Sequence, residues 1–507
     1  MSPATAADDQ ARFDALQRKL VPLWTSIRAL NQDEQTIVVV PSLDTDADLD
    51  ATELQAYEER FLFLLLLLRQ PRARLVYVTG QAIHPSIVDY YLDLMPGVIS
   101  SHARRRLFLV SPLDGSTTPL AQKLLARPRL LERIRGLVPN PDRAHLVPFS
   151  TTWADREIAM ALGIPMYGCD PRLLPWGTKT GSRRLFREEG VPHPAGREDL
   201  ADEDALVEAI VAMRRDRPAT KKVVVKLNLG VSGGGNANLS LAGLPPSGSR
   251  DERDAVRRAL PGMKFESPAL DWPRFLEKLA DQHGIVEERI EADEIRSPSV
   301  QLRVTPLGDV ELLSTHDQLL GGASGQSYLG CRFPADPAYA ALISREALKV
   351  GRRLGREGVL GRFALDFVVS RPRGGGWSVH GIELNLRKGG TTHPFLTLQF
   401  LTDGAYDAES CEFTAPNGRH KYFVASDHVE SPAYRVLTPD DLFDLALRHG
   451  LHFDQTRLTG IVFHMMSALP ARGRTGLTAV ADSPEEADRL YRRFLEVLDA
   501  ETRPAGG

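Results

Sequence analysis

The chain has 507 residues, of which 42% are hydrophobic and 25% are charged, and its formal net charge is −4. A chain of this length can form roughly two to four domains, and its charge balance gives no reason to expect a nucleic-acid partner. The densest apolar run, residues 61–68, is too short to span a bilayer and predicts a buried helical segment, so we expect no membrane association. The N-terminus lacks the pattern of a secretory signal, and three dispersed cysteines (Cys169, Cys331 and Cys411) predict neither a metal site nor a disulfide framework, which favours the cytoplasm.

The first 172 residues predict an α/β domain with an open parallel sheet. The continuous apolar run 36–40 is typical of a parallel strand buried on both faces, and 74–79 and 107–110 predict two more strands. The segments between and after these strands have helical patterns, at 50–69, 86–94, 120–136 and 152–162. Because the first strand is followed by Pro41-Ser42-Leu43-Asp44 and not by a Gly-x-Gly-x-x-Gly turn, we do not expect a dinucleotide site.

Two lysines in the middle of the chain are candidates for binding phosphate. Lys179 lies where a helix is expected to begin, and Lys226 lies in the apolar strand 223–228, which runs into the Gly-rich segment 230–237. A lysine buried among apolar residues needs an anionic partner to stay charged, and a Gly-rich loop lets backbone N–H groups approach a phosphate closely. The alternative, a flexible linker, suits residues 245–249 better, and the spacing is not that of a P-loop.

The next segment predicts a helix at 272–283 and a strand at 285–290. The backbone of this strand can hydrogen-bond an adenine edge, and a nearby carboxylate such as Glu294 can accept from two ribose hydroxyls. The alternative is an edge strand with an exposed acidic face. A hairpin is expected at 300–304 and 310–314, followed by a long Gly- and Ser-rich loop, 316–330, of the kind that often forms a lid, and by a helix at 338–358.

Two apolar segments, 361–368 and 380–387, predict a β-hairpin turned at the Gly-rich run 373–376. Side chains alternate along a strand, so the polar residues of the hairpin can share one face. These residues are Asp366, Glu383, Asn385 and Arg387. Carboxylate and amide oxygens suit Mg²⁺, and an adjacent guanidinium suits a phosphate or a developing oxyanion. The alternative is a solvated polar face on a half-buried hairpin.

Residues 403–507 predict a small α/β region. Helices are expected to begin after Thr438 and Ser483, which have the character of N-caps, and strands are expected at 460–466 and 475–480. The pair His449-x-x-His452 has no third candidate ligand nearby, so it does not predict a metal site.

Taken in order, Lys179, Lys226 with its Gly-rich loop, the acidic strand 285–294 and the hairpin of Asp366 and Glu383 resemble the ATP-grasp superfamily of carboxylate–amine ligases. The resemblance runs from about residue 176 to 400 and is specific as an ordered set. The motif at 383–394, together with 365–368 and the preceding α/β domain, is most similar to the pheganomycin-type peptide ligases of actinobacteria. This resemblance implies three domains: an α/β N-terminal pre-ATP-grasp domain (1–172), an α+β ATP-grasp domain (173–402) and a C-terminal α/β domain (403–507).

The resemblance also implies roles for individual residues. Those assigned to ATP are Lys179, Lys226, Ser232, Gly233, Gly234, Glu287, Glu288, Ile290 and Glu294. In this set the lysines would contact the phosphates and the loop residues would close over them. The acidic strand would form the adenine and ribose pocket, and the carboxylate that holds the ribose would be Glu294 or Glu291. Those assigned to Mg²⁺ are Asp366, Glu383 and Asn385, and the catalytic pair would be Arg387 and Lys226. The segment between Gly235 and Glu287 is long for this fold.

The function implied is that of an ATP-dependent carboxylate–amine (peptide) ligase of natural-product biosynthesis, which forms an amide bond through an acyl phosphate and releases ADP and phosphate. Its substrates would be a small-molecule carboxylate and an amino acid or peptide amine, and the superfamily suggests a homodimer. The alternative is a phosphotransferase, or a nucleotide-binding protein without ligase activity, on the same fold. The sequence does not identify the substrates or the general base for the amine.

Overall fold

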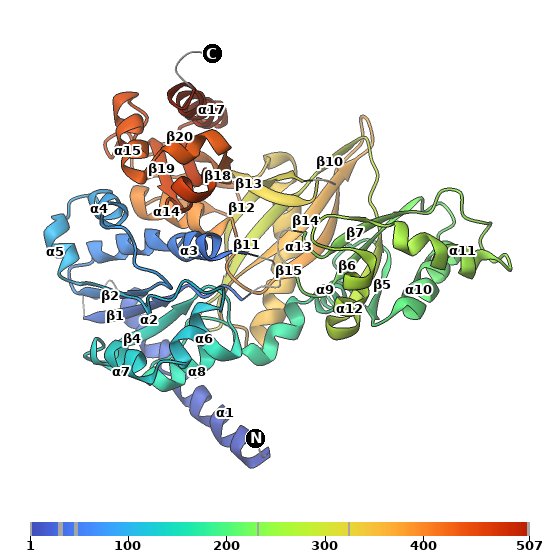
Figure 1. The fold of residues 1–507 in the computed structure, drawn as a ribbon, viewed down its shortest axis with the longest axis horizontal. Helices are drawn as coiled ribbons and strands as arrows, with labels where there is room; N and C mark the ends of the chain where they lie inside the picture. Colours follow the sequence, from blue (N-terminus) through green and yellow to red (C-terminus); the bar gives the residue numbers. More distant parts are fainter. Residues whose placement is uncertain (1–2, 29–33, 45–48, 231–232, 323–324, 504–507) are drawn as a thin grey trace.

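The computed structural model describes residues 3–28, 34–44, 49–230, 233–322 and 325–503. Its N-terminal part is built on a four-stranded parallel sheet with the strand order β3-β2-β1-β4. The strands are β1 (Gln35–Val40), β2 (Ala73–Val78), β3 (Leu107–Val110) and β4 (Ala144–Pro148). Every residue of β1 is buried, because helices cover both faces of this sheet, so the prediction of an open parallel sheet is confirmed. The helix α1 carries the N-terminus away from the body (Figure 1).

The helices predicted in this part are present in the predicted order, with two corrections, and three further helices (α1, α2 and α5) were not predicted. They are α1 (Pro3–Gln17), α2 (Leu20–Arg28), α3 (Ala51–Glu59), α4 (Pro85–Asp93), α5 (Ser100–Arg104), α6 (Leu120–Leu125), α7 (Pro128–Gly136) and α8 (Trp153–Leu162). The single helix predicted at 120–136 is wrong: Pro128 lacks an N–H, so it cannot continue α6 and begins α7 instead. The helix predicted at 50–69 also divides, into α3 and the 3₁₀ helix η1 (Leu62–Arg69), whose leucines are nearly all buried.

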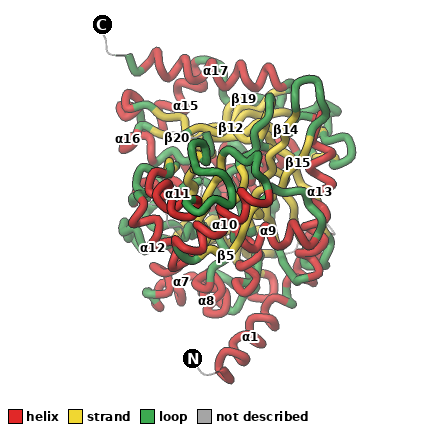
Figure 2. The backbone as a smooth tube through the Cα atoms, turned by 90° about the vertical axis from the view of Figure 1, so that its right-hand side faces the viewer, coloured by secondary structure: helices red, strands yellow, loops and turns green. Residues whose placement is uncertain are grey.

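The middle of the chain forms a separate lobe around a five-stranded antiparallel sheet, ordered β5-β9-β6-β7-β8. The strands are β5 (Gly196–Leu200), β6 (Lys222–Leu227), β7 (Asn236–Ser240), β8 (Lys264–Phe265) and β9 (Gly284–Glu288). The helices are α9 (Lys179–Glu188), which follows the short η3 (Pro171–Gly177), then α10 (Glu203–Asp216), α11 (Glu252–Ala259), η4 (Leu260–Gly262) and α12 (Trp272–Gln282). The lobe that carries α10, α11 and α12 projects from one end of the molecule (Figure 1) and faces the viewer in Figure 2.

A nine-stranded sheet joins this lobe to the rest of the chain, in the order β10-β14-β11-β12-β13-β18-β20-β19 with β15 also paired to β14. Its strands are β10 (Glu294–Arg296), β11 (Pro298–Val304), β12 (Val310–Gly321), β13 (Ser327–Phe333), β14 (Gly361–Arg371), β15 (Ser378–Asn385), β18 (Tyr422–Glu430), β19 (Gly460–His464) and β20 (Arg474–Ala481). The long helix α13 (Pro337–Arg356) packs on β11 and β12 through a shared hydrophobic core. Because β13 pairs with β18, this sheet continues without a break from the predicted ATP-grasp segment into the C-terminal part.

The C-terminal part also contains α14 (Thr392–Thr402), the small pair β16 (Ala405–Asp407) and β17 (Glu412–Thr414), η5 (Pro432–Val436), α15 (Pro439–Arg448), α16 (Ala468–Arg472) and α17 (Pro484–Glu501). The predicted N-caps are confirmed: the side chains of Thr438 and Ser483 accept from the backbone N–H groups of Asp441 and Glu486. No helix in the described part of the chain is long and apolar enough to cross a lipid bilayer.

The long loop predicted at 316–330 is wrong for most of its length. β12 continues to Gly321 and β13 begins at Ser327, so this segment is largely a β-hairpin, and residues 323–324 lie outside the described residues. The base of this hairpin pairs with its neighbours, Asp317 with Pro298 of β11 and Gly330 with Ser426 of β18, and the rest is held by the pairing of β12 with β13. This pairing outweighs the low strand propensity of Gly and Ser.

Glu59 is a buried carboxylate where α3 meets the C-terminal part. Its Oε2 accepts from the backbone N–H of Ser467 at 3.1 Å, and burial raises its pKa from 4.5 to about 7. The folded protein therefore holds a proton here that the unfolded chain releases above pH 4.5. This group consequently makes the protein less stable as the pH rises from about 4.5 to about 7.

We expect Glu59→Gln, which keeps an oxygen acceptor but cannot ionise, to be more stable than the wild type at pH 8 by up to about 3 kcal/mol, and to lose this advantage at pH 5. Urea unfolding at the two pH values measures the difference, and Glu157→Gln at an exposed position of α8 is the control. The same stability difference at both pH values would contradict the assignment.

Candidate active site

The hairpin of β14 and β15 brings the three candidate metal ligands together. Its register pairs Asp366 with Glu383 and Ala364 with Asn385. Asp366 Oδ2 accepts from Asn385 Nδ2 at 2.8 Å, and its Oδ1 accepts from Gln318 Nε2 of β12 at 2.8 Å. This antiparallel pairing therefore places two carboxylates side by side, as the alternation of side chains along the hairpin predicts.

The two carboxylates have different charge environments. Burial, followed by the charge of Glu383, raises the pKa of Asp366 to about 6. Burial also acts to raise the pKa of Glu383, but Lys179 Nζ lies 3.1 Å from Glu383 Oε1 and this charge holds the pKa below its ordinary value. A neighbouring cation would stabilise the ionised form of both groups, which is the behaviour expected at a cation site.

Asp366, Glu383 and Asn385 fit Mg²⁺ by the chemistry of their donor atoms, since all three offer hard oxygen ligands. In the structure Asn385 turns its amide nitrogen toward Asp366, and Gln318 donates to the same carboxylate. These two amide groups stabilise the Asp366 carboxylate by hydrogen bonds. A bound cation would compete with them, and Asn385 would then have to offer its amide oxygen in place of its nitrogen.

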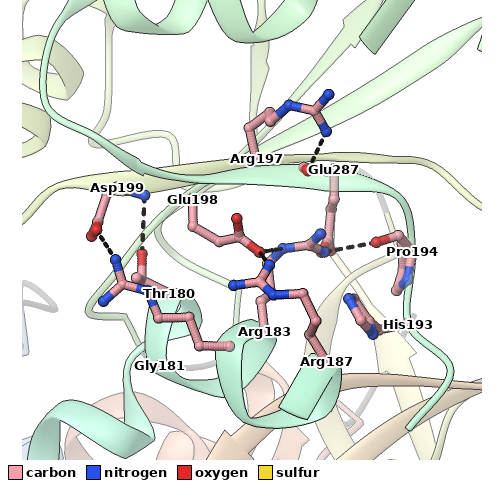
Figure 3. Close-up of polar contacts among 12 residues, drawn as sticks. Thr180, Gly181, Arg183, Arg187, His193, Pro194, Arg197, Glu198, Asp199 and Glu287 are labelled. Atoms are coloured by element: carbon pink, nitrogen blue, oxygen red, sulfur yellow. Dashed lines mark hydrogen bonds and ion pairs between the residues drawn. The ribbon is translucent and has the colours of Figure 1, made fainter. Parts of the chain in front are cut away.

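Lys226 is held in the cavity wall by Glu287. Both side chains are buried, and Lys226 Nζ on β6 contacts Glu287 Oε1 on β9. Glu287 Oε2 accepts from Arg183 Nη1 at 3.0 Å, and the same nitrogen donates to Pro194 O at 2.8 Å (Figure 3). Glu287 thus acts as the anionic partner that a buried lysine needs, and it is itself fixed by a second cation.

The Gly-rich loop after β6 lies against the turn of the β12–β13 hairpin. Gly233 has φ +78°, and a Cβ there would lie 3.1 Å from the carbonyl oxygen of Gln326. Asn236 Nδ2 at the start of β7 donates to Gln326 Oε1 at 2.8 Å. The two segments predicted to gate the site are therefore in contact. Ser232 lies outside the described residues.

The predicted nucleotide pocket is only partly assembled. Glu287, Glu288 and Ile290 line the cavity, and the carboxylate of Glu288 contacts Thr220 Oγ1 and Arg217 Nη1 at 3.1 Å each. The two candidates for the ribose carboxylate, Glu294 and Glu291, are not among the described residues that line this cavity. Glu294 accepts from Arg371 Nε at 2.5 Å and from Arg296 Nη2 at 2.7 Å, and Glu291 pairs with Lys222 at 2.7 Å.

A single cavity of about 580 Å³ collects most of the predicted residues. The predicted residues that line it are Lys179, Lys226, Gly233, Glu287, Glu288, Ile290, Asp366, Glu383, Asn385 and Arg387. Arg387 is fixed by a hydrogen bond from its Nη1 to Lys388 O at 3.1 Å, and burial lowers its pKa. Gly234 follows Gly233 in the same loop but does not itself line the cavity among the described residues.

Both flanking parts of the chain also line this cavity, and the sequence did not reveal which of their residues do so. From the N-terminal part come Tyr57, Arg60 and Phe149, and from the C-terminal part come Asp427, His428 and Arg474. Arg60 and Asp427 are separated by 367 residues and form a buried ion pair at 2.6 Å. No local pattern could have indicated this pair, because its spacing is set only by the packing of the two parts.

Asp427 is also the centre of a buried hydrogen-bond network. Its Oδ1 lies 2.8 Å from His464 Nε2 and 3.2 Å from His393 Nε2. These three residues have the donor types of a metal site. Arg60 already balances the charge of Asp427, so we interpret the group as a hydrogen-bond network that fixes the carboxylate.

Two family models match parts of the chain. The model of the ATP-grasp domain of IQCH-like proteins matches residues 264–409, and the model of the PGM1 C-terminal domain matches residues 441–494. The first contains the hairpin of Asp366 and Glu383, and the second contains His464 and Arg474.

L-propargylglycine–L-glutamate ligase of Streptantibioticus cattleyicolor is 31% identical to the chain over 449 residues, covering 87% of the chain and 88% of that protein. IQ motif-containing protein H of Danio rerio is 22% identical over 528 residues, and the match covers 94% of the chain but only 50% of that longer protein. A biotin carboxylase from Campylobacter jejuni shares the fold, with a TM-score of 0.54, 12% identity and coverage of 94% and 96% of the two chains. The chain therefore belongs to the ATP-grasp superfamily of carboxylate–amine ligases, with L-propargylglycine–L-glutamate ligase among its relatives.

Proposed function

We propose that this ATP-grasp ligase uses ATP and Mg²⁺ to join the carboxylate of one small molecule to the amine of an amino acid or peptide, in the cytoplasm. The observation that carries the proposal is the convergence of two carboxylates, one amide and three cations on one cavity. These residues are Asp366, Glu383, Asn385, Lys179, Lys226 and Arg387. They are the groups that phosphoryl transfer to a carboxylate requires.

A carboxylate is a poor electrophile, so the reaction must first convert it into a mixed anhydride with phosphate. Lys179 and Lys226 would neutralise charge on the transferring phosphoryl group, and Mg²⁺ bound by Asp366, Glu383 and Asn385 would supply the remaining positive charge. Arg387 would stabilise the negative charge that develops when the amine attacks the acyl carbon and inorganic phosphate leaves.

An acyl phosphate reacts with water, so the site must exclude solvent during the reaction. The contact between the Gly-rich loop and the β12–β13 hairpin supports this step, because Asn236 and Gln326 already join the two segments by a 2.8 Å hydrogen bond. In this proposal the two segments separate to admit nucleotide and rejoin over it.

The Streptantibioticus relative is named for two amino acids, L-propargylglycine and L-glutamate, which favours amino acids as both acyl donor and acceptor here. We therefore propose a dipeptide or a short modified peptide as the product, as in natural-product biosynthesis. The donor and the acceptor are to be found by experiment.

Phosphate release from ATP and Mg²⁺ tests the proposal, with pairs of amino acids and short peptides as substrates and mass spectrometry of the products. Phosphate release that requires both a carboxylate and an amine, with a condensed product, is the expected result. ADP formation with a stable phosphorylated product would instead identify a phosphotransferase. If ATP binds but no pair of substrates supports turnover, the proposed ligase activity fails for the substrates tested.

A further inference from the structure

The end of the cavity next to Arg387 is rich in arginine. Arg60 and Arg474 line it together with Arg387, and Asp427 is the carboxylate that accompanies them. Arg60 lies close enough to Arg387 for its charge to help lower the pKa of that guanidinium, after burial. Arg60 pairs with Asp427 and Arg474 lies 3.7 Å from Glu53, and the three guanidinium groups together offer more hydrogen-bond donors than these two carboxylates use, which favours an anionic ligand at this end.

Arg60 is a cation that is fixed before any ligand binds. Its side chain is 6% exposed, and Nη1 donates to Asp427 Oδ2 at 2.6 Å. Its guanidinium carbon lies 4.7 Å from the ring centre of Tyr57 and 5.4 Å from that of Phe149. Its Nε is buried and has no hydrogen-bond partner among the described residues. A buried donor without a partner is costly, so an acceptor from a ligand would relieve it.

Arg474, at the start of β20, contacts the backbone of the same residue, Asp427. Its side chain is 11% exposed, and its Nε donates to the backbone oxygen of Asp427 at 2.8 Å. Its Nη2 lies 3.4 Å from Nε2 of His428, whose pKa is lowered by burial and then by the charge of Arg474. The nearest contact of Nη1 with a carboxylate is a 3.7 Å approach to Glu53. Arg474 therefore keeps hydrogen-bonding capacity beside the cavity.

We propose that Arg60 and Arg474 bind the non-reacting carboxylate of an amino-acid substrate, while the reacting carboxylate lies near Arg387 and Asp366. This inference rests on the proposed function and adds a specificity site to it. A guanidinium matches the geometry of a carboxylate by two parallel hydrogen bonds, which a lysine cannot reproduce. His393 and His464 are positioning residues, because they fix Asp427, which fixes Arg60. A divalent cation at Asp427 would add positive charge beside arginines, whereas a carboxylate balances it.

The non-reacting carboxylate can belong to the acceptor or to the acyl donor, and substrate amides distinguish the two. Each amino acid of a productive pair is supplied as the free acid or with its non-reacting carboxylate converted to a carboxamide. We expect one of these amides to have a KM about 10- to 100-fold higher in the wild type, with the KM for ATP unchanged. The substrate that shows the effect is the one whose carboxylate binds.

Arg474→Gln and Arg60→Lys are expected to raise the KM for the free-acid substrate by about 10- to 100-fold. In these variants the KM for the amide should exceed the KM for the acid by less than about threefold. The matched control is Arg214→Gln: Arg214 is also 11% exposed and pairs with Glu252 at 2.6 Å, but it does not line the cavity. Thermal unfolding of all variants separates this effect from a loss of fold. Arg60→Lys and Arg474→Gln are independent changes, so failure of one to fold leaves the other as the test.

Equal use of acids and amides by the wild type would overturn the inference, and so would variants that keep the full preference for the acid. If no pair of substrates yields ADP with the wild type, the proposed ligase activity fails for the substrates tested. Calorimetric titration of L-glutamate and its α-amide into the MgADP-loaded protein then tests the arginines separately. The carboxylate site is supported if the wild type binds L-glutamate more tightly than the α-amide and Arg474→Gln loses this difference. It is overturned if the wild type and Arg474→Gln bind L-glutamate with equal affinity, or if neither protein binds it.

Discussion

Replacing Asp366 by Asn together with Glu383 by Gln is expected to lower ATP turnover by at least about 10³-fold while leaving the fold intact. The two carboxylates lie opposite each other on β14 and β15, and burial together with the charge of Glu383 raises the pKa of Asp366 to about 6. Amides of the same shape remove both negative charges and leave the hairpin packed. The main loss should therefore appear in catalysis and in Mg²⁺ dependence, and the stability should fall only as far as Lys179 loses the charge of Glu383.

Steady-state ADP formation across a range of Mg²⁺ concentrations measures this effect, with circular dichroism to monitor the fold. The matched control is Asp317→Asn on β12, since Asp317 is a largely buried carboxylate that accepts from Tyr339 Oη at 2.7 Å and does not line the cavity. Unchanged ATP consumption in the double variant would remove Asp366 and Glu383 from the cation site.

Lys226→Met is expected to weaken ATP binding by about 100-fold and to reduce kcat as well. Lys226 is 6% exposed and contacts Glu287, so methionine fills the same space without the charge. Glu287 keeps Arg183 at 3.0 Å, which limits the penalty of leaving a buried carboxylate with one partner fewer. The expected change is therefore a loss of phosphate contact and not of structure.

Isothermal titration with a non-hydrolysable ATP analogue measures the affinity directly. Lys222→Met is the control on the same strand, because Lys222 is exposed and pairs with Glu291 at 2.7 Å away from the cavity. Equal affinity for the analogue in the Lys226→Met variant and in the wild type would place Lys226 outside the nucleotide site.

The parts of the site that the sequence predicted correctly are local. The hairpin of Asp366 and Glu383 follows from alternating side chains and a Gly-rich turn, and the burial of Lys226 follows from the apolar strand around it. Both features depend on residues a short distance apart in the chain. The parallel sheet of the first 172 residues was predicted for the same reason, since a continuous apolar run indicates a strand covered on both faces.

The parts that could not be predicted depend on distant segments. Most of 316–330 is a hairpin that extends β12 and β13 beyond the part where they pair with β11 and β18, although its composition is typical of a loop. Glu294 is drawn away from the cavity by Arg371, a residue of β14 that lies 77 positions further along the chain. Arg60 and Asp427 meet only when both ends of the chain pack against the middle. Contacts of this kind leave no periodic signal in the sequence.

The pairing of β13 with β18 has a consequence for how the enzyme can be divided. If the chain ended after α14, β13 would become an edge strand, and the backbone groups that bond Gly330–Phe333 to Phe423–Ser426 would lose their partners. An exposed edge of this kind pairs readily with other chains and promotes aggregation. The same cut would also remove Asp427, and with it the anchor of Arg60. Residues 403–507 are therefore an integral part of the catalytic body, and a shortened version that ends at α14 would not be a minimal enzyme.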